Sequence, residues 1–391
     1  MLDEQNTYRI TERLCFPRFA GSEGEKRAVS IIMEEFNKAG YSQIKREQFK
    51  TSLYNWKFAE YFFLISCLML IILAILFYTF PIISIILSVV MLISMIKYLG
   101  IVSNPRIKLF RKQDKNILTE NIFTELKGKE SKANIIILAH YDTKSQVFPS
   151  NIRMNLIIIV VFGGFILLVS YIIFSLLKIF LILDYILIDN ILMIFTLIIA
   201  ILAGSNFFNK TGNNSPGAID NAASVATVIE LARYYKVNPL SNIFFTFLIT
   251  GSEELNLGGA YDYIQKHYRE FDPKNTFFID FDLIGGKGAI FIVSADGIPK
   301  KVNDSRLIQY FIESSQKLKI QVDSKYIPTG AWGDHTPIIK KGFEACFVGS
   351  SGSQKKIHTK YDNMDLVSKQ GLKNNLILTD AVIRLIQQDF K

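Results

Sequence analysis

Residues 134–142 read Asn-Ile-Ile-Ile-Leu-Ala-His-Tyr-Asp, an apolar run that ends in a histidine and an aspartate. Such near-continuous apolar runs are typical of strands that are buried on both faces of a sheet. Comparable runs, each bounded by loops, occur at 121–126, 243–250, 276–282, 289–293 and 343–348. Helical patterns alternate with them at 22–38, 222–235, 258–267, 305–319 and 369–388. This alternation predicts an α/β sandwich around a mixed, mostly parallel sheet.

Two long apolar segments interrupt the pattern. Residues 61–96 contain no charged side chain. As one helix they would be about 54 Å long, whereas a bilayer core is about 30 Å thick. Pro81 is the predicted turn between two transmembrane helices at about 60–80 and 82–99, and a second pair is predicted at about 154–177 and 186–205. Buried helices of a soluble core are the less favoured alternative, because such helices are amphipathic and shorter.

Basic residues predict the orientation of these hairpins. Lys57, Lys97, Arg153 and Lys210 border them on the side of the main domain, whereas the far turns hold Lys178 alone. Since positive residues stay on the cytoplasmic side, we expect a multi-pass protein of the cell membrane with a cytoplasmic main domain and N-terminus. The first residues contain no apolar core of a signal peptide, which agrees with this orientation.

The composition excludes several classes of protein. Of the 391 residues, 50% are hydrophobic and 20% charged, which argues against a purely cytosolic globule and rules out a disordered chain. Three cysteines without CxxC spacing argue against a disulfide framework and against a cysteine zinc site. The net charge is +9, but basic residues beside apolar segments favour a lipid bilayer over nucleic acid as the partner.

Ionisable side chains follow the predicted strands, at the edge where open α/β sheets place ligands. His140 can present its imidazole to a metal ion while Asp142 fixes the tautomer, although a hydrogen-bonded loop histidine is the simpler interpretation. Glu253 and Glu254 follow the run at 243–250. One of them can bind a metal while the other moves a proton, but adjacent carboxylates also occur in solvated loops.

Further candidates lie later in the chain. Asp220 precedes a predicted helix and, taken alone, is equally a helix N-cap. Asp280 and Asp282 share one face of a strand that otherwise reads as buried, and a buried carboxylate needs a partner such as a metal ion. His358 supplies the last candidate ligand, and His335 is interpreted as structural or pocket-lining.

Taken in order, these residues lie in motifs that resemble the co-catalytic di-zinc exopeptidases of the leucyl aminopeptidase and glutamate carboxypeptidase type, peptidase family M28. The motifs cover residues 17–25, 139–143, 217–223, 251–258, 282–285, 333–337 and 358–359, and so span nearly all of the non-membrane chain. The resemblance implies a zinc-peptidase-like three-layer sandwich, here with four inserted transmembrane helices. It also implies a cis peptide bond between Asp220 and Asn221.

The resemblance further implies a site for two divalent metal ions, with zinc the favoured metal. The implied ligands are His140 and Asp282 for one ion, Glu254 and His358 for the other, and Asp220 bridging both. Glu253 would be the general base and Asp142 the partner of the His140 ring. One nitrogen and carboxylate oxygens around each ion suit zinc. We therefore expect a membrane-anchored zinc metallopeptidase, most simply an aminopeptidase that hydrolyses peptide substrates with a water between the two ions.

The predicted domains follow from excising the hairpins. Residues 1–51, 119–144 and 211–391 would form the metallopeptidase domain, 52–118 the first membrane hairpin with a basic linker, and 145–210 the second. The oligomeric state stays open.

Two other functions remain as alternatives. One is a non-catalytic receptor or scaffold on a peptidase fold, for which a loss of ligands would be the sign. The other is an acyltransferase similar to glutaminyl cyclases, which use one zinc. Retention of His140 and Asp282 favours two ions. The sequence departs from the family in its inserted hairpins and in Asp280, which stands where the family commonly has Asn.

Overall fold

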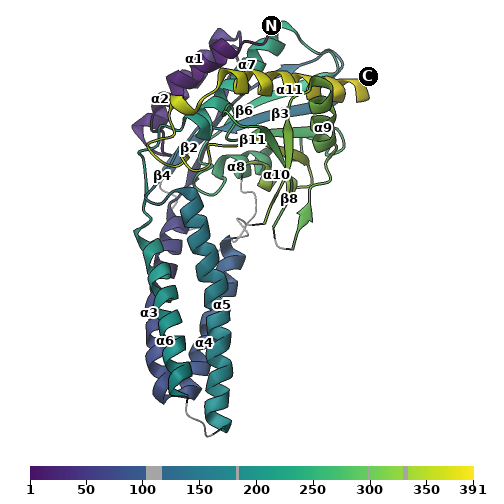
Figure 1. The fold of residues 1–391 in the computed structure, drawn as a ribbon. Coiled ribbons are helices and arrows are strands. Elements are labelled where there is room, and N and C mark those ends of the chain that lie inside the picture. Colours follow the sequence, from purple (N-terminus) through teal and green to yellow (C-terminus); the bar gives the residue numbers. More distant parts are fainter. Residues whose placement is uncertain (103–116, 182–184, 298, 329–332) are drawn as a thin grey trace. The chain divides into compact units, whose positions relative to one another are not determined.

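The computed structural model describes the chain except residues 103–116, 182–184, 298 and 329–332 (Figure 1). The chain divides into two compact units. Unit 1 comprises Met1–Ser52, Lys115–Ser145 and Gly212–Lys391, and unit 2 comprises Leu53–Asp114 and Gln146–Thr211. Most of the predicted basic linker of the first hairpin lies outside the described residues.

Unit 1 is built on a nine-stranded mixed sheet with the order β1-β2-β6-β3-β7-β11-β8-β10, in which β9 pairs with β8. The strands are β1 (Lys45–Thr51), β2 (Ile117–Lys127), β3 (Ala133–His140), β6 (Ile243–Thr250), β7 (Thr276–Phe281), β8 (Ile290–Asp296), β9 (Lys301–Val302), β10 (Val322–Ile327) and β11 (Glu344–Ser350). The central strands β6, β3, β7 and β11 are parallel to one another, as are β8 and β10. The other ladders are antiparallel. The predicted α/β class with a mixed sheet is therefore confirmed.

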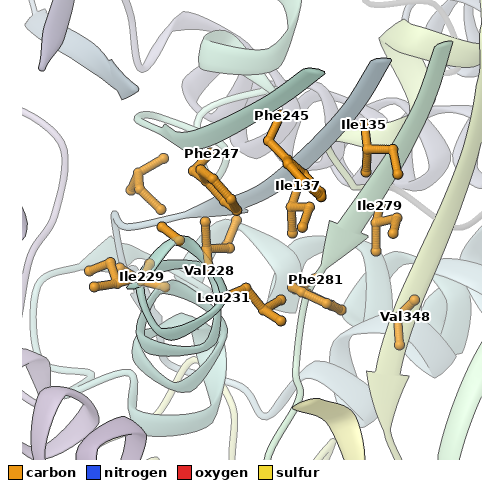
Figure 2. Packing of buried hydrophobic residues seen from close by; sticks show 14 of the residues in the cluster. Ile135, Ile137, Val228, Ile229, Leu231, Phe245, Phe247, Ile279, Phe281 and Val348 are labelled. Atoms are coloured by element: carbon orange, nitrogen blue, oxygen red, sulfur yellow. The ribbon is translucent and has the colours of Figure 1, made fainter. Parts of the chain in front are cut away.

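Helices cover both faces of this sheet, because alternate residues of each central strand point to opposite sides. In β3, Ile135 and Ile137 belong to the main core, whereas Ile136 and Leu138 belong to a second core on the other face. Figure 2 shows Ile135 and Ile137 in the main core together with Val228 of α7. The main core receives side chains from α1 (Glu4–Leu14), α2 (Glu23–Lys38), α7 (Ala223–Val237), α9 (Arg306–Leu318) and α11 (Lys369–Asp389), and the second from α8 (Gly258–His267) and α10 (His335–Ile339).

The N-terminus of α2, which begins within the helical pattern at 22–38, is capped by side chains. Ser22 is the N-cap, and its hydroxyl oxygen accepts the N–H of Glu25 at 3.2 Å. The Glu25 carboxylate accepts the N–H of Gly21 at 2.5 Å, one residue before the N-cap. It also contacts the Thr119 hydroxyl, so it links the helix to β2.

Unit 2 contains four long helices: α3 (Tyr54–Thr79), α4 (Pro81–Val102), α5 (Ser150–Phe180) and α6 (Ile186–Ser205). All four are long and apolar enough to cross a membrane. Pro81, the predicted turn, is the first residue of α4, where its missing N–H leaves no hydrogen bond unmade. Helix α3 packs on α4 and α6, and α5 packs on the same two helices. The short strands β4 (Ser145–Gln146) and β5 (Thr211–Gly212) flank the second pair of helices in the sequence.

Candidate metal centre

The parallel strands bring the candidate residues to one edge of the sheet. His140 is the last residue of β3, and Glu253 and Glu254 come shortly after β6 ends at Thr250. Asp282 directly follows β7. Since β3 pairs in parallel with both β6 and β7, their carboxyl ends meet there, as in other open α/β sheets.

Five side chains form two overlapping groups at this edge. In the first group, His140 Nε2 lies 3.3 Å from Asp220 Oδ1 and 3.6 Å from Asp282 Oδ1. In the second, His358 Nε2 lies 3.0 Å from Asp220 Oδ2 and 3.1 Å from Glu254 Oε1. Asp220 therefore contributes one carboxylate oxygen to each group. All five residues were selected from the sequence, and the structure brings all five together.

The donor atoms of these groups fit a metal ion. Each group offers one imidazole nitrogen and two carboxylates, a donor set that suits zinc. Asp282 Oδ1 is buried and has no hydrogen-bond partner among the residues that the structure describes. A buried carboxylate oxygen without such a partner is costly, and a cation held between the same side chains would compensate for it.

The turn that carries Asp220 is held from two sides. The Asp362 carboxylate accepts the N–H of Ile219 at 2.8 Å and that of Asp220 at 3.1 Å. Burial, together with the charge of Asp220, raises the pKa of Asp362 to about 7. The peptide bond between Asp220 and Asn221 is cis, and the Asn221 side chain donates to the carbonyl of Phe281 at 2.9 Å. The sequence assigned no role to Asp362, although it lies only four residues after His358.

Asp142 contacts the His140 ring less closely than the sequence suggested. His140 Nδ1 lies 3.1 Å from the main-chain oxygen of Asp142 and 3.6 Å from its carboxylate. The Asp142 carboxylate instead accepts the N–H groups of Glu253 at 2.9 Å and Glu254 at 3.2 Å. Asp142 thus fixes the backbone of the loop after β6.

Glu253 lies beside the two groups without belonging to either. Its Oε2 is 4.0 Å from His140 Nε2, and its side chain is 10% exposed. Burial raises the pKa of Glu253 well above its usual value, and the charges of Glu254 and Asp282 add to this effect. A carboxyl group that binds its proton more firmly than an exposed one is suited to moving protons.

The three candidate ligand carboxylates differ in how their surroundings shift the pKa. Burial raises the pKa of Asp282 to about 6. Burial also favours the neutral form of Glu254, but the charges of His358 and Lys144 outweigh it and lower the pKa of Glu254 to about 2. Burial likewise opposes ionisation of Asp220, whose pKa is nevertheless held well below its usual value by His358 and His140. Both shifts favour the ionised forms of Glu254 and Asp220.

Two buried basic residues beside these groups were not assigned a role from the sequence. Lys144 Nζ lies 2.5 Å from Glu254 Oε2. Arg18 is fully buried and donates to main-chain carbonyls of Tyr141 at 2.8 Å and Gly217 at 3.1 Å. Arg18 thereby joins the segment after His140 to the turn before Asp220. In the sequence, Arg18 lies inside the motif at 17–25, whereas Lys144 directly follows the motif at 139–143.

Asp280 and His335 form a pair next to the candidate ligands. Asp280 Oδ2 accepts the N–H of His335 at 2.9 Å and lies 3.0 Å from its Nδ1. Both side chains are almost fully buried. Asp334, which precedes His335, contacts the Thr250 hydroxyl, and burial with the charge of Asp280 raises the pKa of Asp334 well above its usual value.

The sequence of the centre is similar to that of known peptidases. Residues 203–382 match the model of peptidase family M28. Aminopeptidase YwaD of Bacillus subtilis strain 168 is 27% identical over 190 residues, which are 45% of this chain and 39% of that protein. The chain thus spans about two fifths of the length of this curated relative. Asp220, Glu253, Glu254, Asp282 and His358 lie within the family match, and His140 precedes it.

Solved structures share the fold. A zinc aminopeptidase from Bacillus subtilis has a TM-score of 0.57 at 14% identity, over 98% of this chain and 95% of that chain. A glutaminyl cyclase from an Acidobacteriales bacterium has a TM-score of 0.56 at 16% identity, over 99% and 96% of the two chains. At these identities the likeness concerns the fold. Together with the match over residues 203–382, this likeness makes the chain similar to the peptidases of family M28.

Proposed function

We propose that unit 1 is a zinc-dependent aminopeptidase with two metal ions and that the four apolar helices of unit 2 anchor it in a membrane. One observation carries the proposal: Asp220 directs Oδ1 toward His140 and Oδ2 toward His358. A carboxylate shared between two donor groups is the arrangement required of a ligand that bridges two ions. The relatives named as aminopeptidases, one of them a zinc enzyme, support this choice of reaction and metal.

The proposed ligands divide between the ions according to the two groups. His140 and Asp282 would hold the first ion, Glu254 and His358 the second, and Asp220 both. Bound there, the ions would supply Lewis acidity to the scissile carbonyl and lower the pKa of the attacking water.

Proton transfer would be carried out by Glu253, which Asp142 holds in position. The Glu253 carboxylate would take the proton of the attacking water and pass it to the nitrogen of the leaving amine, so that it ends the cycle as it began. Asp142 would keep Glu253 in place, because it accepts the main-chain N–H groups of Glu253 and Glu254. Burial of Glu253 excludes the bulk water that would otherwise exchange its proton.

Metal analysis of the full chain in detergent, combined with a peptide panel, tests the proposal. We expect two divalent ions per chain and cleavage of peptides with a free N-terminus, but not of the same peptides after N-acetylation. Equal cleavage of both sets would contradict an aminopeptidase, and no cleavage by protein that carries two ions would favour a scaffold.

The glutaminyl cyclase fold neighbour supports a second candidate, an acyl transfer that closes an N-terminal glutamine on itself. This reaction releases ammonia from a peptide that begins with Gln and leaves its peptide bonds intact. One bound ion together with ammonia release would favour this function over the aminopeptidase.

We also propose that unit 1 faces the cytoplasm, because Lys and Arg gather at the ends of the hairpins nearer to unit 1 in the sequence. A reporter enzyme that is active only outside the cytoplasm, fused after Lys391, should be inactive. A reporter that requires the cytoplasm should be active in the same position.

A further inference from the structure

Lys144 places a positive charge inside the candidate metal centre. It lies four residues after His140, and its side chain is only 7% exposed. Its Nζ is 2.5 Å from Oε2 of Glu254, whose side chain is 3% exposed. The ammonium group therefore forms a buried ion pair with one of the side chains that would hold the second ion.

The two oxygens of Glu254 have different neighbours. Oε1 lies 3.1 Å from His358 Nε2 and belongs to the second metal group, whereas Oε2 faces Lys144. The oxygen that pairs with Lys144 is thus not the one that lies beside His358. Glu254 is left to approach the second ion with Oε1.

The first metal group has a different electrostatic environment. Among the described residues, the ion pairs of Asp220 and Asp282 are with histidines, and neither carboxylate pairs with a lysine or an arginine. Glu254 is the ligand that already has a fixed cation at its side. The two ion positions therefore differ in charge, although their donor atoms are of the same kinds.

This difference affects binding of the second ion in two ways. A divalent ion on Glu254 Oε1 is repelled by an ammonium group on the other side of the same carboxylate, and such repulsion is strong in a buried site. The ammonium also compensates the charge of Glu254 before any ion binds, so the gain from adding the ion is smaller. Both effects weaken the second position.

We propose that Lys144 is a built-in counter-ion of the second metal position, which makes the second ion the weaker-bound one and keeps the centre folded when that ion leaves. The inference rests on the proposed two-ion centre and adds to it a positioning residue that sets the difference in affinity between the ions. The lysine substitutes for part of the metal charge, so the centre can exchange its second ion without losing its structure.

Zinc titration of the full chain in detergent tests this role. The protein is stripped with a chelator and titrated with Zn²⁺ against a chromophoric chelator, which yields an affinity for each ion. We expect two unequal affinities in the wild type. Lys144→Met should tighten the weaker one about tenfold or more, because it removes the repulsion, and should leave the tighter one nearly unchanged.

Two variants separate the charge from other effects. Lys144→Arg keeps the positive charge and should retain the wild-type affinities. Lys266→Met removes a lysine that pairs with Asp262 on α8 and should change neither affinity. Tightening in Lys144→Arg as large as in Lys144→Met would overturn the role of the charge.

Thermal unfolding of the metal-free proteins supplies a second measurement. The Tm of the stripped Lys144→Met protein should fall below that of the stripped wild type, since Glu254 loses its counter-ion. Addition of zinc should close most of this gap. A stripped variant as stable as the stripped wild type would contradict a counter-ion function.

The outcomes separate this inference from the proposed function. If the wild type binds two ions and Lys144→Met binds the weaker ion with the same affinity as the wild type, the counter-ion role of Lys144 is wrong but the two-ion centre stands. One ion or none in both proteins would overturn the two-ion centre and the inference with it. One ion in the wild type but two in Lys144→Met would support the inference. If Lys144→Met does not fold, Lys144→Gln, which is neutral and still donates hydrogen bonds, decides by the same criterion.

Discussion

Asp142 accepts the main-chain N–H of Glu253 at 2.9 Å, so a side chain that follows β3 holds a residue that follows β6. The other carboxylate oxygen of Asp142 accepts the N–H of Glu254 at 3.2 Å. Asp142 therefore uses both oxygens to position the loop with the proposed base and one proposed ligand. Because β3 and β6 are neighbouring parallel strands, this bridge joins adjacent strand ends of the sheet.

Asp142→Asn should lower kcat about 10- to 100-fold, a range typical of residues that support metal ligands. The amide has one acceptor oxygen, so one of the two N–H groups loses its partner and the loop is less firmly held. Steady-state kinetics with an N-terminally free peptide measure the effect. Asp365→Asn, at an exposed position, is the control, and wild-type kcat in Asp142→Asn would show that the bridge is dispensable.

Glu253→Gln and Glu254→Gln should have different effects although the residues are adjacent. Glu253→Gln should keep both ions and lower kcat about 100-fold or more, because it removes the general base but no metal ligand. Glu254→Gln should bind the second ion less tightly. Metal content and kcat measured on the same samples separate the two, and identical behaviour of the variants would show that the proposed roles are wrong.

The sequence predicts the central part of the fold well for a physical reason. Strands such as β6, at 243–250, are buried on both faces and must be apolar throughout, so the sequence pattern marks them clearly. The edge strands β1 and β10 are missed because Lys45–Thr51 and Val322–Ile327 mix exposed polar residues with a few apolar ones. Hydrogen bonds with a neighbouring strand, rather than burial, define them, and those partners are distant in the sequence.

At the site, the sequence predicts the candidate metal ligands better than the residues that hold those ligands in position. Histidines and carboxylates at the ends of apolar runs suggest metal chemistry directly. Arg18 and Lys144 act through partners that are distant in the sequence, such as Gly217 and Glu254, so their contacts appear only once the strands are placed side by side. Asp142 shows the same limit: its spacing from His140 suggests a contact with the ring, whereas its carboxylate binds the loop after β6.

The stability of unit 1 should depend on the ionisation of Glu25. Burial raises the pKa of Glu25 to about 7, although its hydrogen bonds with Thr119 and Gly21 favour the ionised form. In an unfolded chain its pKa is about 4.3. Between about pH 4 and pH 7 the folded state therefore holds a proton that the unfolded state has released, so this contribution to stability falls as the pH rises.

Glu25→Gln, which cannot ionise, tests that dependence. Relative to the wild type, the variant should gain stability from pH 5 to pH 8, by on the order of 2–3 kcal/mol at most. Melting temperatures of both proteins across this range measure the difference, and comparison with the wild type cancels the titration of other groups. A constant difference across the range would mean that Glu25 keeps an ordinary pKa in the folded protein.

The helices of unit 2 should depend on an ion pair between α5 and α6. Lys178 Nζ lies 2.7 Å from Asp189 Oδ2, and the two side chains are 11% and 8% exposed. Lys178 also donates to the main-chain oxygen of Phe77 in α3 at 3.1 Å, so a single ammonium group joins three helices. Removal of one partner leaves the other charge buried and unpaired, which costs about 3–5 kcal/mol.

A double-mutant cycle measures this coupling. Lys178→Met and Asp189→Leu should each lower the Tm of the full chain in detergent, whereas the double variant should recover most of the loss, because no buried charge then remains. Tyr78→Phe, which removes only the exposed hydrogen bond from Tyr78 to Asn190, is the control and should change the Tm little. If the losses of the single variants simply added in the double variant, each charge would have another partner, and the pair would not hold the three helices together.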